Sequence, residues 1–373
     1  MSGEIAPHGV IRHCFWNIQG YKSQVLGNKL LNQDFLDEIK DADIVGLAET
    51  HIHTEILSHL DIPGYNRLHY KNRKAHSNGK CGSGGIAIFC KPAVSNLITI
   101  AHNVHDDVIW IKIGKRVYGD NEDTYLGTCY ISPSGNKEHT AKTFEKLGEE
   151  ISNFQRKGRV ILQGDFNARI NTENDTICPD KYDERLGITF TAIPPRNSED
   201  MGETNVRGVE FLSLCKSMNM TILNGRKSGD LFGKYTSVNW NGRAVVDFGV
   251  IPVDSYEDVT SFRVGNYAPF ISDHCPIFFE LKTVHKKVVE PDDNLKEIPK
   301  IFRISDDDLL KLKETLLSPA IAEKLSEMNN CTDPQALATG ITDTLLEACT
   351  LSDMRPKKTF ASKLTSHGLT RNA

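Results

Sequence analysis

Five short polar motifs in this chain each close a run of β-branched and aliphatic residues, where a buried strand would end. In chain order they are Phe15-Trp16-Asn17, Glu49-Thr50, Gly164-Asp165-Phe166-Asn167, Asp247 and Ser272-Asp273-His274. Together they supply carboxylates, amides and one imidazole. Carboxylates bind hard cations such as Mg²⁺, and carboxylate and imidazole side chains carry protons. The set therefore predicts a Mg²⁺-dependent phosphodiester hydrolase.

Three of these residues suit a cation, a water molecule and a phosphate. Glu49 closes the run 43–48, which is apolar after Asp43, so we expect a lone carboxylate at a strand end, which is a suitable Mg²⁺ ligand. Asp165 and Asn167 follow the run 160–163, and residues two apart in a strand face the same way. The carboxylate could take a proton from water and the amide could donate to phosphate. Taken singly, the same residues also fit a surface glutamate and a simple Asp-Phe-Asn turn.

Asp247 needs a partner, because it lies inside the apolar run 244–250 and an unpaired buried carboxylate is costly. A cation or a hydrogen-bonded ring would meet that need, and His274 is the candidate ring. Tyr130 lies just before Ile131-Ser132-Pro133, so its hydroxyl could reach a phosphate at the mouth of a strand.

Basic side chains gather between residues 71 and 80, directly before a glycine-rich stretch. Such a loop could bind a phosphate backbone, although a solvated loop fits equally well. A hairpin around Trp240 would add one more arginine beside Asp247. The candidate nucleic-acid-binding residues are Lys71, Arg73, Lys74, Lys80 and Arg243.

The composition is that of a globular chain, with 373 residues, 39% of them hydrophobic and 25% charged. A net charge of −5 argues against a protein that coats DNA non-specifically, but it leaves room for a nuclease with local basic loops. Nine scattered cysteines without a Cys-x-x-Cys pair predict reduced thiols, an intracellular protein and no zinc site. The apolar runs are too short to cross a membrane. The glycine-rich stretch opens into a strand, so we expect no organic cofactor.

The hydrophobic patterns predict an α/β fold with ten strands and three helices before residue 284. The strands are expected at 10–17, 43–49, 85–91, 107–113, 124–131, 159–164, 220–223, 244–251, 259–264 and 275–281. The helices are expected at 27–40, 139–155 and 207–217. Ten strands with few helices favour two packed sheets with helices outside.

The pattern changes after residue 283. Residues 10–283 form the predicted catalytic domain, and the charged, proline-containing segment 284–304 is a predicted linker. A helical extension is expected over 305–350, because Ser305 and three aspartates precede a leucine-rich run. The basic, polar tail 351–373 is predicted to be disordered.

The motifs, in this order, resemble those of the endonuclease/exonuclease/phosphatase superfamily, which includes apurinic endonucleases and pancreatic deoxyribonuclease. A closer resemblance, to endonuclease domains of non-LTR retrotransposon polyproteins, rests on the segments 82–89, 129–133, 222–226 and 245–248. The resemblance covers residues 10–283. It implies a four-layer α/β sandwich of two mainly antiparallel sheets flanked by helices, with a C-terminal helical extension.

The resemblance also implies a role for each matching residue. Glu49, with Asn17 and Asp273, would hold Mg²⁺, for which Mn²⁺ could substitute. Asp165 would orient or deprotonate the attacking water, and Asn167 would contact the scissile phosphate.

The remaining roles concern the transition state. His274, oriented by Asp247, would stabilise it, and Tyr130 would add a phosphate contact. The superfamily usually has Asp-Tyr where this chain has Asp247-Phe248, and this affects only local packing. No reverse-transcriptase signature follows the domain, so the chain resembles a truncated element, a fragment or a domesticated nuclease.

The resemblance therefore predicts a Mg²⁺-dependent DNA endonuclease that nicks one strand and leaves a 3′-hydroxyl. Its partner would be DNA and its location nuclear, with no membrane association; the oligomeric state is left open. One alternative is an RNA or small-phosphoester hydrolase of the same superfamily. The other is a catalytically idle nucleic-acid-binding derivative.

Overall fold

The computed structural model describes residues 9–52, 59–72, 84–101, 105–177, 191, 193–283, 306–328 and 334–352. The chain divides into two compact units, residues 1–288 and 289–373. The predicted linker at 284–304 and the tail from 353 lie outside the described residues, as do Arg73, Lys74 and Lys80.

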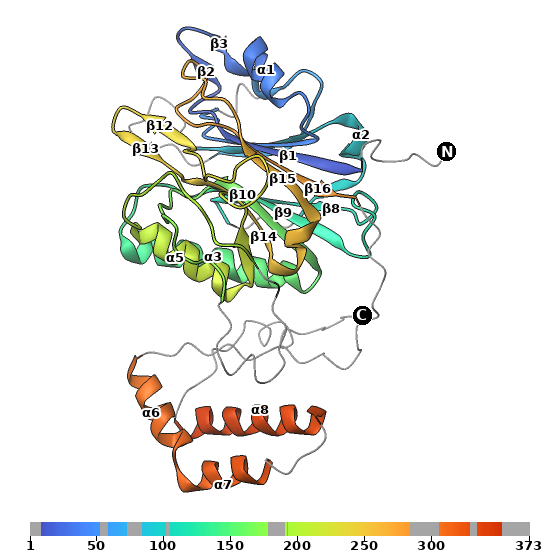
Figure 1. The fold of residues 1–373 in the computed structure, drawn as a ribbon. Helices are drawn as coiled ribbons and strands as arrows, with labels where there is room; N and C mark the ends of the chain where they lie inside the picture. The colour runs from blue at the N-terminus through green and yellow to red at the C-terminus, as the bar shows by residue number, and fades with distance from the viewer. Residues whose placement is uncertain are drawn as a thin grey trace, which may run out of the picture. The chain divides into compact units, whose positions relative to one another are not determined.

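The first unit contains two six-stranded sheets (Figure 1). In spatial order, the first sheet contains β15 (Val259–Val264), β16 (Ile277–Lys282), β1 (Val10–Asn17), β4 (Ile44–Ala48), β6 (Ile86–Cys90) and β5 (Asn66–Lys71). The second contains β11 (Met220–Ile222), β14 (Asp247–Pro252), β10 (Gly158–Asp165), β9 (Asp123–Tyr130), β8 (Val108–Ile113) and β7 (Ile98–Ile100).

Each sheet has one parallel pair of strands, β1 with β4 and β9 with β10, and its other neighbours are antiparallel. This confirms the prediction of two mainly antiparallel sheets. The carboxyl ends of all four parallel strands lie at one edge of the sandwich, because Asn17 at the end of β1 contacts Asp165 at the end of β10.

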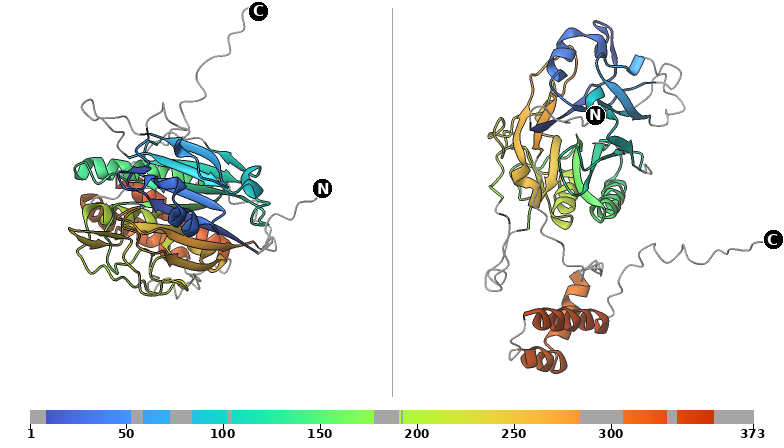
Figure 2. Two further views of the ribbon diagram at one scale, coloured as in Figure 1. Left: turned by 90° about the horizontal axis from the view of Figure 1, so that it is seen from above. Right: turned by 90° about the vertical axis from the view of Figure 1, so that its right-hand side faces the viewer.

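Hydrophobic residues fill three layers of core. Because side chains alternate along a strand, Phe15 of β1 packs between the sheets while Trp16 faces outward and stacks on Phe35 of α1 (Gln33–Ile39). The outer face of the second sheet is covered by α3 (Lys137–Gln155) and α5 (Val206–Ser217). These two helices lie side by side in Figure 1, and the right-hand view of Figure 2 looks along them. The predicted sandwich with helices outside is confirmed.

Two predicted elements differ from the structure. The helix expected over 27–40 is instead β3 (Gly27–Asn28), paired with β2 (Lys22–Ser23), then η1 (Lys29–Leu31) and α1. Asn28 and Asn32 are the reason, because each side chain caps a separate helical start. The strand expected over 244–251 begins only at Asp247, and Ala244 belongs instead to a hairpin.

That hairpin consists of β12 (Ser237–Asn239) and β13 (Gly242–Ala244), with Trp240 at its turn, as expected. The strands β2, β5 and β7 were not predicted from the sequence. The described residues of this unit also include two short helical segments, α2 (Pro92–Ser95) and η3 (Val253–Asp258).

The second unit contains α6 (Asp306–Leu316), α7 (Pro319–Met328) and α8 (Pro334–Leu351). Helices are therefore present within the extension expected over 305–350. Ile321 and Ala348 are buried within this unit. In the described part of the chain, no helix combines enough length with enough apolar character to cross a membrane.

Candidate active site

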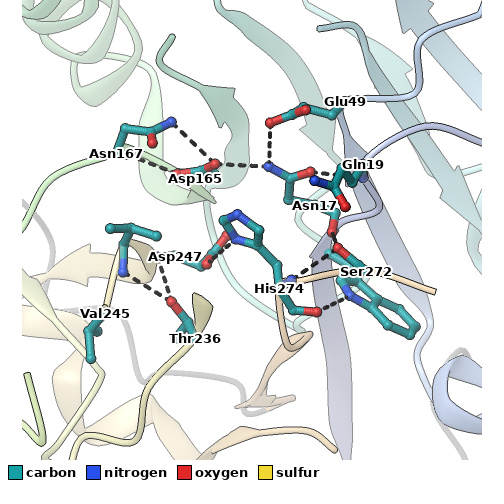
Figure 3. Close-up of polar contacts among 12 residues, drawn as sticks. Asn17, Gln19, Glu49, Asp165, Asn167, Thr236, Val245, Asp247, Ser272 and His274 are labelled. Carbon is teal, nitrogen blue, oxygen red and sulfur yellow. Dashed lines mark hydrogen bonds and ion pairs between the residues drawn. The ribbon is translucent and has the colours of Figure 1, made fainter. Parts of the chain in front are cut away.

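Asn17 connects the two sheets at their shared edge. Its side chain is 1% exposed, and its Nδ2 donates to Glu49 Oε1 and to Asp165 Oδ2, both at 2.9 Å (Figure 3). Its Oδ1 accepts a hydrogen bond from the backbone of Gln19 at 3.1 Å. The amide is thus fixed in one orientation and joins a carboxylate of the first sheet to a carboxylate of the second.

Glu49 is the more exposed of these two carboxylates. It follows β4 in a left-handed conformation (φ +51°), which turns its side chain toward Asn17, and His51 lies 3.2 Å from its Oε2. Burial acts to raise the pKa of Glu49, but hydrogen bonds from His51, Asn17 and Tyr130 outweigh it and lower the pKa to about 2. Glu49 is therefore ionised at neutral pH and suited to hold a cation.

Asp165 lies at the centre of the second sheet's edge. Its register partners are Tyr130 on β9 and Asp247 on β14, so three polar side chains meet at the ends of adjacent strands. Burial first, and then the charge of Asp247, raise the pKa of Asp165 to about 7. A carboxylate with a raised pKa is a stronger base than an ordinary aspartate.

His274 forms the expected pair with Asp247. The ring Nδ1 lies 2.8 Å from Asp247 Oδ2, and both residues are buried. Burial disfavours the charged ring, but the carboxylates of Asp247 and Asp165 outweigh it and raise the pKa of His274 to about 10. The ring is therefore an imidazolium at neutral pH, and it can donate to a phosphate oxygen.

Two residues without a predicted role hold this pair in place. Thr236 Oγ1 accepts hydrogen bonds from the backbone N–H groups of Val246 and Asp247, each at 3.0 Å. Ser272 Oγ donates to the carbonyl of Asn17 at 2.6 Å and accepts from the backbone N–H of His274 at 3.0 Å. Ser272 belongs to a recognisable motif, whereas Thr236 carries no sequence signal because its partners lie ten and eleven residues further along the chain.

Asn167 lies beside Asp165, as expected, but not in an extension of the strand. It adopts a left-handed conformation (φ +48°), and its backbone N–H donates to Asp165 Oδ1 at 2.9 Å. Its side-chain Nδ2 donates to the Ile131 carbonyl at 2.9 Å and lies 3.3 Å from Asp165 Oδ2. Asparagine tolerates this conformation better than most residues. The turn brings the amide next to the carboxylate.

The donor set fits a divalent cation. Asp247 Oδ1 is buried, and among the described residues it has no hydrogen-bond partner. One atom from each of Asp165, Asp247 and His274 lies within 4.8 Å of the others. A cation would supply the missing partner and reduce the repulsion between the two aspartates. Protonated His274 cannot ligate a metal, so the ligands must be oxygen atoms, and Glu49 is the acidic side chain of this edge whose pKa is lowered and which is ionised at neutral pH.

The remaining candidates are more dispersed. Asp273 is half-buried, and burial and the charge of Glu49 raise its pKa. Lys71, at the end of β5, donates to the His105 carbonyl and lies 3.7 Å from Asp106. Arg243 is exposed on β13 and lies 5.9 Å from the ring centre of Tyr235.

A two-sheet sandwich that gathers carboxylates, amides and an imidazolium at one edge defines a class of phosphodiester hydrolases. The chain belongs to the endonuclease/exonuclease/phosphatase family, whose model matches residues 14–274. Members of this family hydrolyse phosphodiesters, and the chain is a hydrolase that acts on ester bonds. No curated protein sequence matches it.

Several solved structures share the fold. The AP endonuclease LMAP from Leishmania major is 13% identical, with a TM-score of 0.52 over 74% of this chain and 89% of that one. The 3′ phosphatase NExo from Neisseria, bound to a product DNA hairpin, is 15% identical, with a TM-score of 0.49 over 73% and 99%. The endonuclease domain of TRAS1, a telomere-specific non-LTR retrotransposon, is 16% identical, with a TM-score of 0.45 over 74% and 99%.

Proposed function

We propose that this chain is a Mg²⁺-dependent DNA endonuclease that nicks one strand and leaves a 3′-hydroxyl. The observation that carries the proposal is the amide of Asn17, which joins the ionised Glu49 to the more basic Asp165. This arrangement places a cation ligand beside a proton acceptor, as hydrolysis of a phosphodiester by water requires. A DNA substrate would also place the protein in the nucleus.

Glu49, with Asn17 and Asp273, would hold Mg²⁺, and Mn²⁺ could substitute. When bound, the cation would neutralise charge on the phosphate oxygens and on the leaving oxygen. Tyr130 is buried at the end of β9 and hydrogen-bonded to Glu49, so it is near enough to contact the same phosphate.

Asp165 would accept a proton from the attacking water, because its raised pKa makes it a competent base at neutral pH. Asn167 would hold Asp165 in place and donate to the scissile phosphate. The imidazolium of His274, kept charged by Asp247, would donate to a non-bridging oxygen as negative charge builds there.

DNA is the proposed substrate because the sequence motifs resemble those of retrotransposon endonuclease domains. The AP endonuclease LMAP has the same fold, which agrees with this choice. The side chains of Trp240 (94% exposed) and Arg243 are exposed on the β12–β13 hairpin and offer a surface for DNA. This hairpin lies beside the active site, because the backbone of Ser237 forms an isolated antiparallel β-bridge with that of His274.

The test is relaxation of supercoiled plasmid by the full chain in Mg²⁺ and in EDTA. We expect conversion to open circle in Mg²⁺ alone, and closure of the nick by DNA ligase if a 3′-hydroxyl and a 5′-phosphate are left. Asp165→Asn should lower the rate by about 10²–10⁴-fold, as loss of a general base does. Asp37→Asn, at an exposed position on α1, is the matched control and should nick normally.

Three results would contradict the proposal. Equal nicking by Asp165→Asn and the unaltered chain would exclude the assigned base. A folded chain that binds plasmid without cutting it would favour an idle binding derivative, whereas cleavage of RNA or of a small phosphodiester alone would favour the other alternative.

A further inference from the structure

Lys29 is a buried cation that the chemistry above does not use. It is the first residue of η1 and is 4% exposed. Its Nζ donates to the backbone carbonyls of Ile18 at 2.8 Å and Gln19 at 3.1 Å. An ammonium group loses hydration when it is buried, so these two contacts must offset a cost that a hydrophobic side chain would not have.

The carbonyls that Lys29 holds belong to the turn that follows β1. Gln19 adopts a left-handed conformation (φ +46°) although it is not glycine. Such a conformation persists only where the surroundings fix it. Gln19 also provides the backbone N–H that orients the side chain of Asn17. Lys29 and the Asn17 amide are therefore connected through a single strained residue.

A second strained turn packs against the first one. Glu49 and His51 are both left-handed, at φ +51°. The backbone N–H of Ile18 donates to Ala48 O at 3.0 Å, and that of Gly20 donates to Glu49 O at 2.6 Å. Fixing the turn after β1 thus also fixes the backbone of Glu49.

The pKa of Lys29 also shows that its ammonium lies near the proposed cation ligands. Burial lowers the pKa of the Lys29 ammonium to about 8, and the carboxylates of Asp273 and Glu49 oppose that change. The ammonium is therefore within electrostatic reach of both carboxylates, and it offsets part of their repulsion when no cation is bound.

We propose that Lys29 is a positioning residue that assembles the cation site before any cation binds. Its ammonium holds the 17–20 turn, and through that turn it holds the Asn17 amide and Glu49 in one arrangement. The inference rests on the proposed function, because it assumes that Asn17 and Glu49 hold a divalent cation.

The test compares Lys29→Met with the unaltered chain in the absence of DNA. Mn²⁺ is titrated by calorimetry, and amide hydrogen exchange of the 17–21 segment is measured in EDTA. We expect the midpoint, which is the Mn²⁺ concentration at half-saturation, to be about 10–100-fold higher in Lys29→Met, as is typical when a residue that orients a metal ligand is removed. We also expect faster exchange at Gly20 and Tyr21, whose N–H groups bond to the second turn.

Lys22→Met is the matched control, because Lys22 is an exposed lysine close by in β2. It removes the same charge and should change neither measurement. Lys29→Arg, which keeps the charge and the donors, should recover part of the Mn²⁺ affinity. Circular dichroism of each variant verifies that it is folded, and the exchange measurement in EDTA reports on the turn even if Mn²⁺ binding is weak.

Three results would overturn the inference. Tighter Mn²⁺ binding by Lys29→Met would mean that the ammonium only repels the cation. An unchanged midpoint with unchanged exchange would mean that Lys29 only fills space. Absence of Mn²⁺ binding by the unaltered chain would remove the site itself. An unaltered chain that binds Mn²⁺ but does not cut DNA would refute the proposed function and leave the comparison between variants decisive.

Discussion

The Nδ2 atom of Asn17 donates to Oδ2 of Asp165 at 2.9 Å, although 148 positions separate the two residues in the chain. The same nitrogen also donates to Glu49. A single amide therefore sets the separation between the proposed cation ligand and the proposed base, which belong to different sheets.

Replacing Asn17 by alanine should lower the nicking rate constant by about 10²–10³-fold, as loss of one fixed donor in an active site does. The reason is that Asp165 and Glu49 would lose their shared donor. Single-turnover nicking of plasmid measures the change. Asn121→Ala, at an exposed position between β8 and β9, should be normal. A rate within twofold of the unaltered chain would show that the amide is not needed.

Asp247→Asn should shift the pH dependence of nicking. Removing this carboxylate lowers the pKa of His274 from about 10 toward or below the ordinary value of about 6.5. The imidazolium would then be lost near neutral pH, so the alkaline limb of the pH–rate profile should move to lower pH. An alkaline limb that stays in place would mean that the charge of His274 is not used.

The Asp247–His274 pair should stabilise the folded chain more at low pH than at high pH. Because the pKa of His274 is raised on folding, its contribution is fully present below about pH 6.5 and is lost as pH rises toward about 10. The difference in melting temperature between the unaltered chain and Asp247→Asn should therefore shrink across that window. A difference that is constant from pH 6 to pH 10 would contradict the assignment.

Thr236→Val should be more harmful than Thr236→Ser. Valine leaves the buried N–H groups of Val246 and Asp247 without their acceptor, and an unsatisfied buried group costs about 1–3 kcal/mol. We expect lower stability in urea unfolding and slower nicking, because Asp247 is no longer held. Serine keeps the oxygen and should restore most of both properties. Equal behaviour of the two variants would indicate that the methyl group matters instead.

Asp175→Asn should destabilise the chain by about 3–5 kcal/mol, because it breaks a buried ion pair. Asp175 is fully buried and accepts from Arg226 Nη1 at 2.8 Å and Nη2 at 2.6 Å. Burial lowers the pKa of the neighbouring Arg196 to about 10, and the charge of Asp175 opposes that change. One carboxylate therefore stabilises the positive charges of two arginines. Urea unfolding measures the loss, and nicking below the melting range should persist. A change below 1 kcal/mol would refute this account.

Much of the fold could be predicted because local patterns report burial directly. Eight-residue β1 was expected at its observed bounds, since its apolar residues face two cores at once. The segment 27–40 was predicted wrongly, because its apolar spacing suits a helix while Asn28 and Asn32 interrupt it with caps. The short edge strands β5 and β7 were missed, since an exposed edge strand needs little hydrophobic pattern.

The sequence by itself determined which side chains are available for chemistry and that each lies beside or within an apolar strand. This follows from elementary physics, because a polar group that interrupts a buried run must lie at the edge of a sheet or have a partner. It also predicted that Asp247 would pair with His274, since burial of either alone is costly.

Only the tertiary structure decided how these side chains are arranged. That Asn17 faces both Glu49 and Asp165 depends on how two sheets stack, and no local pattern encodes that geometry. The left-handed turns at Glu49 and Asn167, and the contacts of Thr236 and Lys29, depend on neighbours distant in the chain or in another strand. Strand order and sheet packing bring these groups within hydrogen-bonding distance, because they result from the free energy of the whole core and not from any one segment.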